Sequence, residues 1–95
     1  MARRTVLFTP GDRPDRCRTA PATGADTVVF DLEDAVAPDD ADGARAALGD
    51  LLADPTFDPG NAEVAVRVGR SPVADLDALV DVSSRLDAVM VPKAT

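Results

Sequence analysis

The sequence predicts an α/β fold in which parallel strands alternate with helices, in the order β-α-β-α-β-α-β. Four short apolar runs rich in β-branched residues favour strands, and they lie at residues 6–8, 28–30, 64–66 with Val68, and 89–91. These runs are apolar on both faces, as expected for parallel strands buried between two layers. The segments between them carry helix start signals and helical spacing, so we expect each strand to reach the next through a crossover helix.

The first expected helix begins at residues 12–14, where a proline stands at an early helical position. It extends toward Thr23 and closes at Gly24, because glycine often ends a helix. Pro21 lies inside this segment, and we expect it to shorten or kink the helix because proline has no backbone N–H to donate.

The second expected helix begins near Asp39 and Asp40, whose charges suit the positive end of the helix dipole, and it ends at residues 54–55. Its apolar residues fall on one stripe at helical spacing. They are Ala41, Ala44, Leu48, Leu51 and Leu52. The third helix opens at residues 71–72, a serine cap followed by proline. Its expected buried face consists of Leu76, Leu79 and Val80.

The chain has 95 residues, enough for one small domain or for a piece of a larger one. Its formal net charge of -7 argues against a nucleic-acid partner, because phosphate binding needs a basic face. No apolar run approaches the roughly 18 residues of a membrane helix and no signal peptide is visible, so we expect a cytoplasmic protein without a membrane partner. The acidic residues are mostly Asp, which fits a protein kept soluble in high salt and GC-rich coding equally well.

The absence of histidine and the single cysteine limit the chemistry of any site. Zinc would lack its soft ligands, and serine-type triads and histidine general bases are excluded. A hard cation such as Mg²⁺ remains suitable because it takes oxygen ligands. Cys17 can form no internal disulfide, and we expect core packing or mild exposure for it rather than a catalytic role.

The sharpest candidate site follows the second apolar run, since ligands of parallel α/β folds bind at the carboxyl ends of strands. Asp31 and Glu33 are expected on one strand face, with Asp34 at the turn. Like charges this close need a cation, a proton or a base such as Lys93 or Arg67. Two interpretations are about equally favoured: a Mg²⁺ site or its water shell, and a salt-bridged rim with a helix cap.

Three basic residues are further candidates. Arg67 lies within a valine strand and needs a carboxylate partner, either from a substrate or from Glu33, and the pattern slightly favours the internal partner. Lys93 could act as a base, a Schiff-base former or a counter-ion, of which the counter-ion is favoured. Arg13 stands at a helix start, where phosphate can bind, although an exposed arginine without a role is commoner.

Together these segments resemble the citrate lyase β-subunit-like branch of the HpcH/HpaI aldolase family. The stretches that carry the resemblance, in the family's order, are residues 7–14, 24–36, 44–45, 66–68 and 87–93. The resemblance implies a (β/α)₈ TIM barrel, which normally needs about 250 residues. Residues 1–95 are then expected to be its truncated N-terminal half, with a homo-oligomer of trimer type in the full-length form.

The family resemblance implies a lyase that cleaves or forms C–C bonds of acyl-CoA thioesters such as citryl-CoA or malyl-CoA. Mg²⁺ would hold the enolate or 2-oxo acid oxygens. It also implies that Arg67 is the catalytic residue that holds the substrate carboxylate or carbonyl. Glu33 and Asp34 would accept hydrogen bonds from metal-bound water, and Arg13 would approach the CoA phosphates. The direct metal ligands are expected on a fifth and a sixth strand, beyond this chain.

Asp31 and Lys93 are expected to support that site. Gly69 and Thr95 depart from the family, which usually has Asn and a polar residue such as Glu at these positions. Alternatives within the family are a malyl-CoA thioesterase and a non-catalytic half-barrel that assembles with another chain, and the fragment alone is expected to be inactive. A receiver-like signalling domain is disfavoured, because its acidic pair should follow the first strand, where residues 10–11 are Pro-Gly.

Overall fold

The computed structural model describes residues 5–33, 38–69 and 72–91. Within these residues the strands are β1 (Val6–Pro10), β2 (Thr27–Asp31), β3 (Glu63–Arg67) and β4 (Ala88–Met90). The α-helices are α1 (Pro14–Thr19), α2 (Ala41–Ala53) and α3 (Pro72–Leu79). Short 3₁₀ helices are η1 (Ala20–Thr23), η2 (Pro38–Asp40) and η3 (Val80–Arg85).

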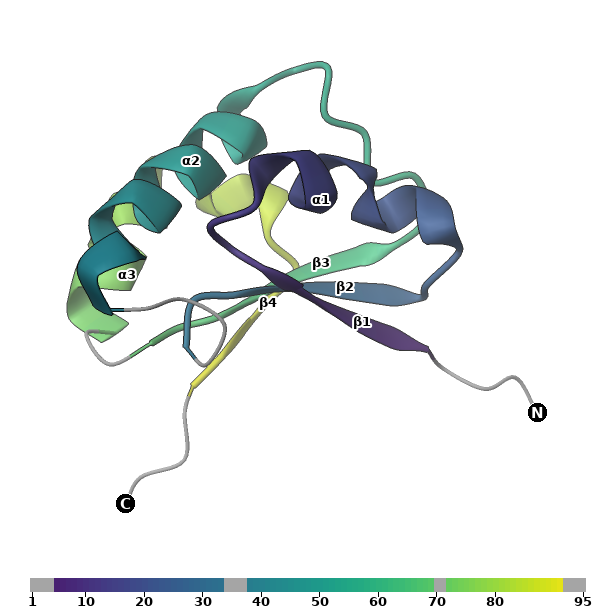
Figure 1. The fold of residues 1–95 in the computed structure, drawn as a ribbon. Coiled ribbons are helices and arrows are strands. Elements are labelled where there is room, and N and C mark those ends of the chain that lie inside the picture. Colours follow the sequence, from purple (N-terminus) through teal and green to yellow (C-terminus); the bar gives the residue numbers. More distant parts are fainter. Residues whose placement is uncertain (1–4, 34–37, 70–71, 92–95) are drawn as a thin grey trace.

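The described strands form one sheet in the order β1-β2-β3-β4, and every neighbouring pair is parallel (Figure 1). The predicted alternation of parallel strands and helices is therefore confirmed. The register aligns Pro10 with Asp31, and Asp31 with Arg67. Because these residues end their strands, the carboxyl ends of β1, β2 and β3 meet at one edge of the sheet.

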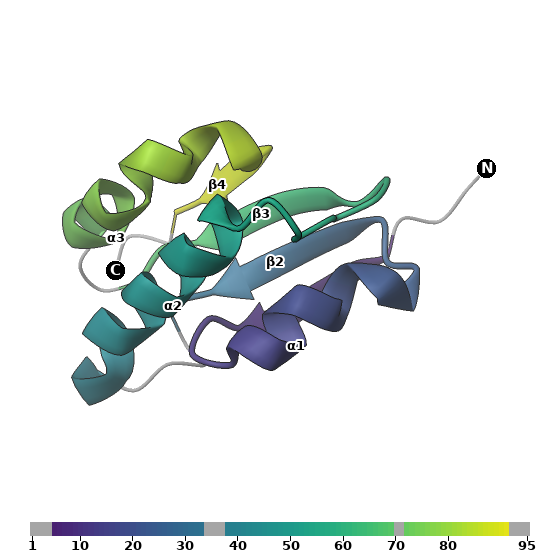
Figure 2. The same ribbon diagram turned by 90° about the horizontal axis from the view of Figure 1, so that it is seen from above.

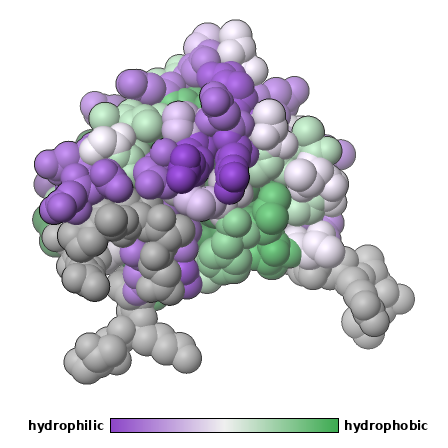
Figure 3. All heavy atoms as spheres, viewed as in Figure 1, coloured by the Kyte–Doolittle hydropathy of each residue, from purple (hydrophilic) through white to green (hydrophobic). Residues whose placement is uncertain are grey.

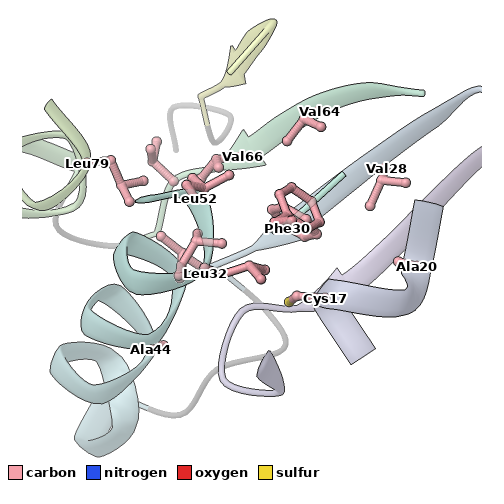
Figure 4. Close-up of a cluster of buried hydrophobic side chains, with 14 residues drawn as sticks. Cys17, Ala20, Val28, Phe30, Leu32, Ala44, Leu52, Val64, Val66 and Leu79 are labelled. Carbon is pink, nitrogen blue, oxygen red and sulfur yellow. The ribbon is translucent and has the colours of Figure 1, made fainter. Parts of the chain in front are cut away.

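The described helices all lie over one face of the sheet, as the two views of the ribbon show (Figures 1 and 2). The core fills the space between the two layers (Figure 4). Phe30 of β2 is fully buried, and its ring lies 6.2 Å from that of Phe57 at a tilt of 54°. The strands contribute Val28, Phe30, Val64 and Val66, Val68 follows directly after β3, and the helices contribute Cys17, Ala20, Ala44, Leu48, Leu51, Leu52 and Leu79.

The expectation that all four strands are buried on both faces is wrong for the two edge strands. Val6 and Phe8 of β1 are 52% and 45% exposed, and Met90 of β4 is 40% exposed. Within the described part of the chain, no second layer covers the face opposite the helices, and β1 and β4 each lack an outer neighbour. Figure 3 shows apolar side chains gathered below the helices.

The first helical segment follows the prediction. The α-helix ends at Thr19, Pro21 lies in the tighter helix η1, and Gly24 closes the segment with a φ of 88°. The stripe of α2 is also confirmed, because its leucines and Ala44 are buried.

The predicted face of the third helix is correct only in part. Leu79 is buried, but Leu76 and Val80 are 45% and 62% exposed. The buried positions of α3 are Asp75 and Leu79, four residues apart, and Leu76 lies about 100° around the helix from Asp75. Val80 begins η3, whose tighter winding breaks the α-helical spacing. None of the helices described is long and apolar enough to cross a bilayer.

Candidate functional site

Strand alternation decides which side chains reach the face opposite the helices. Phe30 and Val66 belong to the core, so their neighbours Asp31 and Arg67 point to the opposite face. These two residues are register partners at the carboxyl ends of β2 and β3. Their side chains therefore lie next to each other at the edge where a ligand of a parallel α/β fold binds.

Asp31 and Arg67 form a two-point ion pair. Arg67 Nε donates to Asp31 Oδ1 at 3.0 Å, and Arg67 Nη2 donates to Asp31 Oδ2 at 2.6 Å. Glu33 Oε1 lies 3.3 Å from the same Nε, and the backbone N–H of Glu33 donates to Asp31 Oδ1 at 2.8 Å. The guanidinium carbon stacks 5.0 Å from the ring centre of Phe8. We call Phe8, Asp31, Glu33 and Arg67 the Arg67 cluster.

The structure gives Arg67 an internal carboxylate partner, which is the option that the sequence slightly favoured. The main partner is Asp31 rather than Glu33, because the parallel register aligns Asp31 directly with Arg67. Asp31 is 5% exposed in its side chain, whereas Arg67 is 23% exposed. Asp34 and Lys93 lie outside the described residues.

Arg13 is exposed and immediately precedes α1. It lines a shallow cleft of about 450 Å³ together with Asp12, Asp39 and Asp40. These side chains carry more negative than positive charge, so the cleft by itself does not favour an anion.

Asp75 is a buried charged residue that sequence reasoning missed. It lies in the first turn of α3, and its carboxylate pairs with Arg45 of α2. Its hydrogen bond from Arg45, together with the nearby charge, raises the pKa of that guanidinium. An acidic residue in the first turn of a helix is usually exposed and interacts with the helix dipole. The position of Asp75 in the sequence therefore did not indicate that its side chain is buried. Arg45 stood out only as part of the resemblance at residues 44–45.

The described oxygen donors limit how a metal ion could be held. No three Asp, Glu or Cys side chains gather closely enough among these residues to hold a metal ion directly. Asp31 and Glu33 face the guanidinium of Arg67, and carboxylate oxygens can accept further hydrogen bonds from water. This donor set fits a position around the water shell of Mg²⁺ and not direct coordination.

Cys17 packs in the core as expected. Its Sγ donates to the carbonyl oxygen of Pro10 at 3.3 Å. Burial, and to a lesser extent the charge of Asp12, raises the pKa of the thiol to about 12. Because the thiolate is the reactive form, Cys17 is not a nucleophile at neutral pH.

Comparison with known proteins gives the family. Residues 4–95 match the profile of HpcH/HpaI aldolase/citrate lyase. The chain belongs to this family. The receiver-like alternative is therefore wrong, because the match spans almost the whole sequence.

Curated proteins of this family are similar in sequence to this chain over almost its whole length. Citrate lyase subunit beta of Leuconostoc mesenteroides subsp. cremoris is 37% identical over 93 residues, covering 96% of this chain and 30% of that protein. The L-malyl-CoA/beta-methylmalyl-CoA lyase of Cereibacter sphaeroides is 39% identical, and the match covers 95% of this chain and 29% of that protein. The (3S)-malyl-CoA thioesterase of the same species is 38% identical, covering 97% and 32%. The chain thus spans about a third of the length of these relatives.

Solved structures of the same family match the fold. CitE from Mycobacterium tuberculosis in complex with magnesium and acetate superposes with a TM-score of 0.72 at 39% identity, covering 94% of this chain and 35% of that one. CitE in complex with magnesium, acetoacetate and coenzyme A gives a TM-score of 0.68 at 36% identity, covering 98% and 33%. The four parallel strands described here are therefore a fragment of the larger barrel of these proteins.

Proposed function

We propose that this chain is the N-terminal half of the TIM-barrel domain of a Mg²⁺-dependent carbon–carbon lyase. Its substrates would be acyl-CoA thioesters of 2- or 3-hydroxy dicarboxylic or tricarboxylic acids, of the citryl-CoA or malyl-CoA type. The observation that carries this proposal is the Arg67 cluster, which lies at the ligand-binding edge of a parallel sheet in a chain 37% identical to a citrate lyase subunit beta.

Arg67 binds the carboxylate or carbonyl of the substrate. A guanidinium recognises a carboxylate through two parallel hydrogen bonds, and Arg67 is sufficiently exposed for a ligand to reach it. Asp31 holds the guanidinium on one side and the ring of Phe8 lies against it. Because these contacts exist without substrate, little side-chain freedom is lost when the substrate binds.

Mg²⁺, when bound, supplies Lewis-acid stabilisation of the enolate or 2-oxo acid oxygens. Glu33 and Asp34 accept hydrogen bonds from water on the metal, and the direct ligands come from outside residues 1–95. The support for this part of the proposal comes from two similar solved structures, CitE with magnesium and acetate, and a citrate lyase beta subunit from M. tuberculosis with oxaloacetate and magnesium.

Arg13 approaches the phosphates of CoA, and Asp31 and Lys93 support the site as charged neighbours. A CitE complex that contains coenzyme A supports a CoA thioester as ligand. The complete protein binds small acyl-CoA or 2-oxo acid molecules, forms a homo-oligomer of trimer type, and works in the cytoplasm.

The experiment uses a chimera in which residues 1–95 replace the matching segment of the Cereibacter sphaeroides malyl-CoA lyase. We expect Mg²⁺-dependent turnover of malyl-CoA or citryl-CoA, and we expect Arg67→Ala to lower kcat/KM by roughly 100-fold or more. Arg18→Ala is the matched control, because Arg18 is 43% exposed and pairs with Asp54 away from the cluster. Equal turnover of Arg67→Ala and the unmodified chimera would remove Arg67 from the mechanism.

A thioesterase is the second candidate function, favoured by the 38% identity to a (3S)-malyl-CoA thioesterase. The products separate the two activities. A lyase releases a 2-oxo acid and a shorter acyl-CoA, whereas a thioesterase releases free CoA, which a thiol reagent detects. A third outcome, no turnover of either kind in a folded chimera, would favour a non-catalytic half-barrel.

A further inference from the structure

A second buried ion pair lies close along the chain to the Arg67 cluster. The side chain of Asp75 is 3% exposed, and that of Arg45 is 15% exposed. Asp75 Oδ1 accepts a hydrogen bond from Arg45 Nε at 2.5 Å, and Asp75 Oδ2 accepts one from the backbone N–H of Gly69 at 2.6 Å. We call Asp75, Arg45 and Gly69 the Asp75 clamp. It joins α3, α2 and Gly69, which lies two residues beyond the end of β3, through the ion pair and the backbone hydrogen bond.

Gly69 lies where the ends of β2 and β3 touch. The backbone N–H of Leu32 donates to the carbonyl oxygen of Arg67 at 2.9 Å. A Cβ at Gly69 would lie only 2.3 Å from the carbonyl oxygen of Leu32, so the two backbones pass directly against each other. Leu32 stands between the two acidic residues of the Arg67 cluster. A shift of Gly69 would therefore move the backbone that carries those carboxylates, because packed interiors transmit strain.

We propose that Asp75 and Arg45 are positioning residues for the ligand site. Through the N–H of Gly69 they fix the end of β3 against the end of β2, and this holds the guanidinium of Arg67 in place. The consequence for ligand binding rests on the proposed function, whereas the clamp itself does not.

The chemistry of the clamp requires a carboxylate at position 75. Both of its partners are donors, and an ionised Asp offers two acceptor oxygens. A buried charge must also be paired, and Arg45 supplies the opposite charge. Arg45 has a second partner, Asp42, at 2.7 Å, but the side chain of Asp42 is 98% exposed. An exposed pair of this kind contributes little, so Asp42 provides a matched control.

The test compares Asp75→Ala with Asp42→Ala in the ¹⁵N-labelled chimera that carries residues 1–95. One readout is the hydrogen exchange of the Gly69 amide relative to that of Val66 in the middle of β3. The other is the Nε–H resonance of Arg67. We expect Asp75→Ala to accelerate the relative exchange of Gly69 by about tenfold or more and to shift the Arg67 resonance. Asp42→Ala should change neither.

Arg45→Lys is the milder variant, and it carries the test if Asp75→Ala does not fold. Lysine keeps the positive charge but lacks the Nε donor, so both signals should change in the same direction and less strongly. Faster exchange of Gly69 with an unmoved Arg67 resonance would overturn the positioning role, and no change in either signal would overturn the clamp. Neither readout needs activity, so an Arg67→Ala chimera with full turnover would refute the proposed function and leave this result intact.

Discussion

Asp31 carries a charge that is almost completely buried, and it accepts hydrogen bonds from the guanidinium of Arg67 and from the backbone N–H of Glu33. Replacing it with the isosteric Asn would remove the negative charge that pairs with the guanidinium of Arg67. We expect Asp31→Asn to lower the free energy of unfolding by about 2–3 kcal/mol, somewhat less than for a fully buried pair because Arg67 is partly exposed. Urea denaturation of the chimera that carries residues 1–95 measures this change, and Asp42→Asn should be nearly neutral. A loss no larger than that of the control would show that the pair contributes little.

Cys17 provides a pH prediction. Folding raises the pKa of its thiol from an ordinary value near 9 to about 12, because burial disfavours the thiolate. The stability that this group contributes is fully present below pH 9 and is lost as the pH rises toward 12. We therefore expect Cys17→Ala to flatten the decline of stability between these values.

We also expect the thiol of Cys17 to react with an alkylating reagent at pH 8 only as fast as the chain unfolds. Rapid labelling of the native chain would contradict the burial of this side chain.

Single residues show where sequence reasoning reaches its limit. An arginine in a valine strand revealed that Arg67 needs a carboxylate, because an unpaired buried charge is costly. It could not reveal that the carboxylate is Asp31, because the register between β2 and β3 is a tertiary property. Asp75 was missed for the related reason that its burial depends on how α3 packs on α2.

At the scale of elements, α2 offers a test of helix propensity. Gly43 lies in this helix, and a Cβ at this position would meet no atom within 4 Å. We expect Gly43→Ala to raise the free energy of unfolding by about 0.5–1 kcal/mol, because alanine loses less backbone entropy in a helix.

The opposite result is expected at the end of β3. Gly69→Ala would place a methyl group 2.3 Å from the carbonyl oxygen of Leu32, closer than any relaxed contact. We expect a loss of about 1–3 kcal/mol, as for other overpacked positions. Thermal melts of Gly43→Ala and Gly69→Ala in the chimera check both signs, and a stabilising alanine at position 69 would refute the close approach of the two backbones.

The elements themselves were largely predictable. The β-branched runs found all four strands, and proline, glycine and aspartate located the helix ends to within a few residues, since these residues act through local backbone chemistry. Val80 was misjudged because the α-helix stops at Leu79, and its change to a 3₁₀ helix left no mark in the spacing. Leu76 was misjudged because the buried face of α3 runs through Asp75 and Leu79.

At the scale of the molecule, the edge strands of the described sheet expose apolar side chains, and β1 and β4 have no outer neighbour among the described residues. Val6, Phe8, Met90 and Val91 are at least 40% exposed, and such surface favours association. We expect the 95-residue chain alone to show no lyase turnover and to unfold with a broad or concentration-dependent transition. Sedimentation and calorimetry at several concentrations check this. A sharp, concentration-independent transition from a monomer would contradict it.

The strand order follows the sequence order without exception among the described strands, so each new strand pairs only with the one made just before it. No strand has to wait for a later one to open a gap in the sheet. During synthesis, the first three strands can align as soon as Arg67 leaves the ribosome, and any further unit can join beside β4 without disturbing the Arg67 cluster. Growth by addition at one side would allow the ligand-binding edge to be shaped early and completed late.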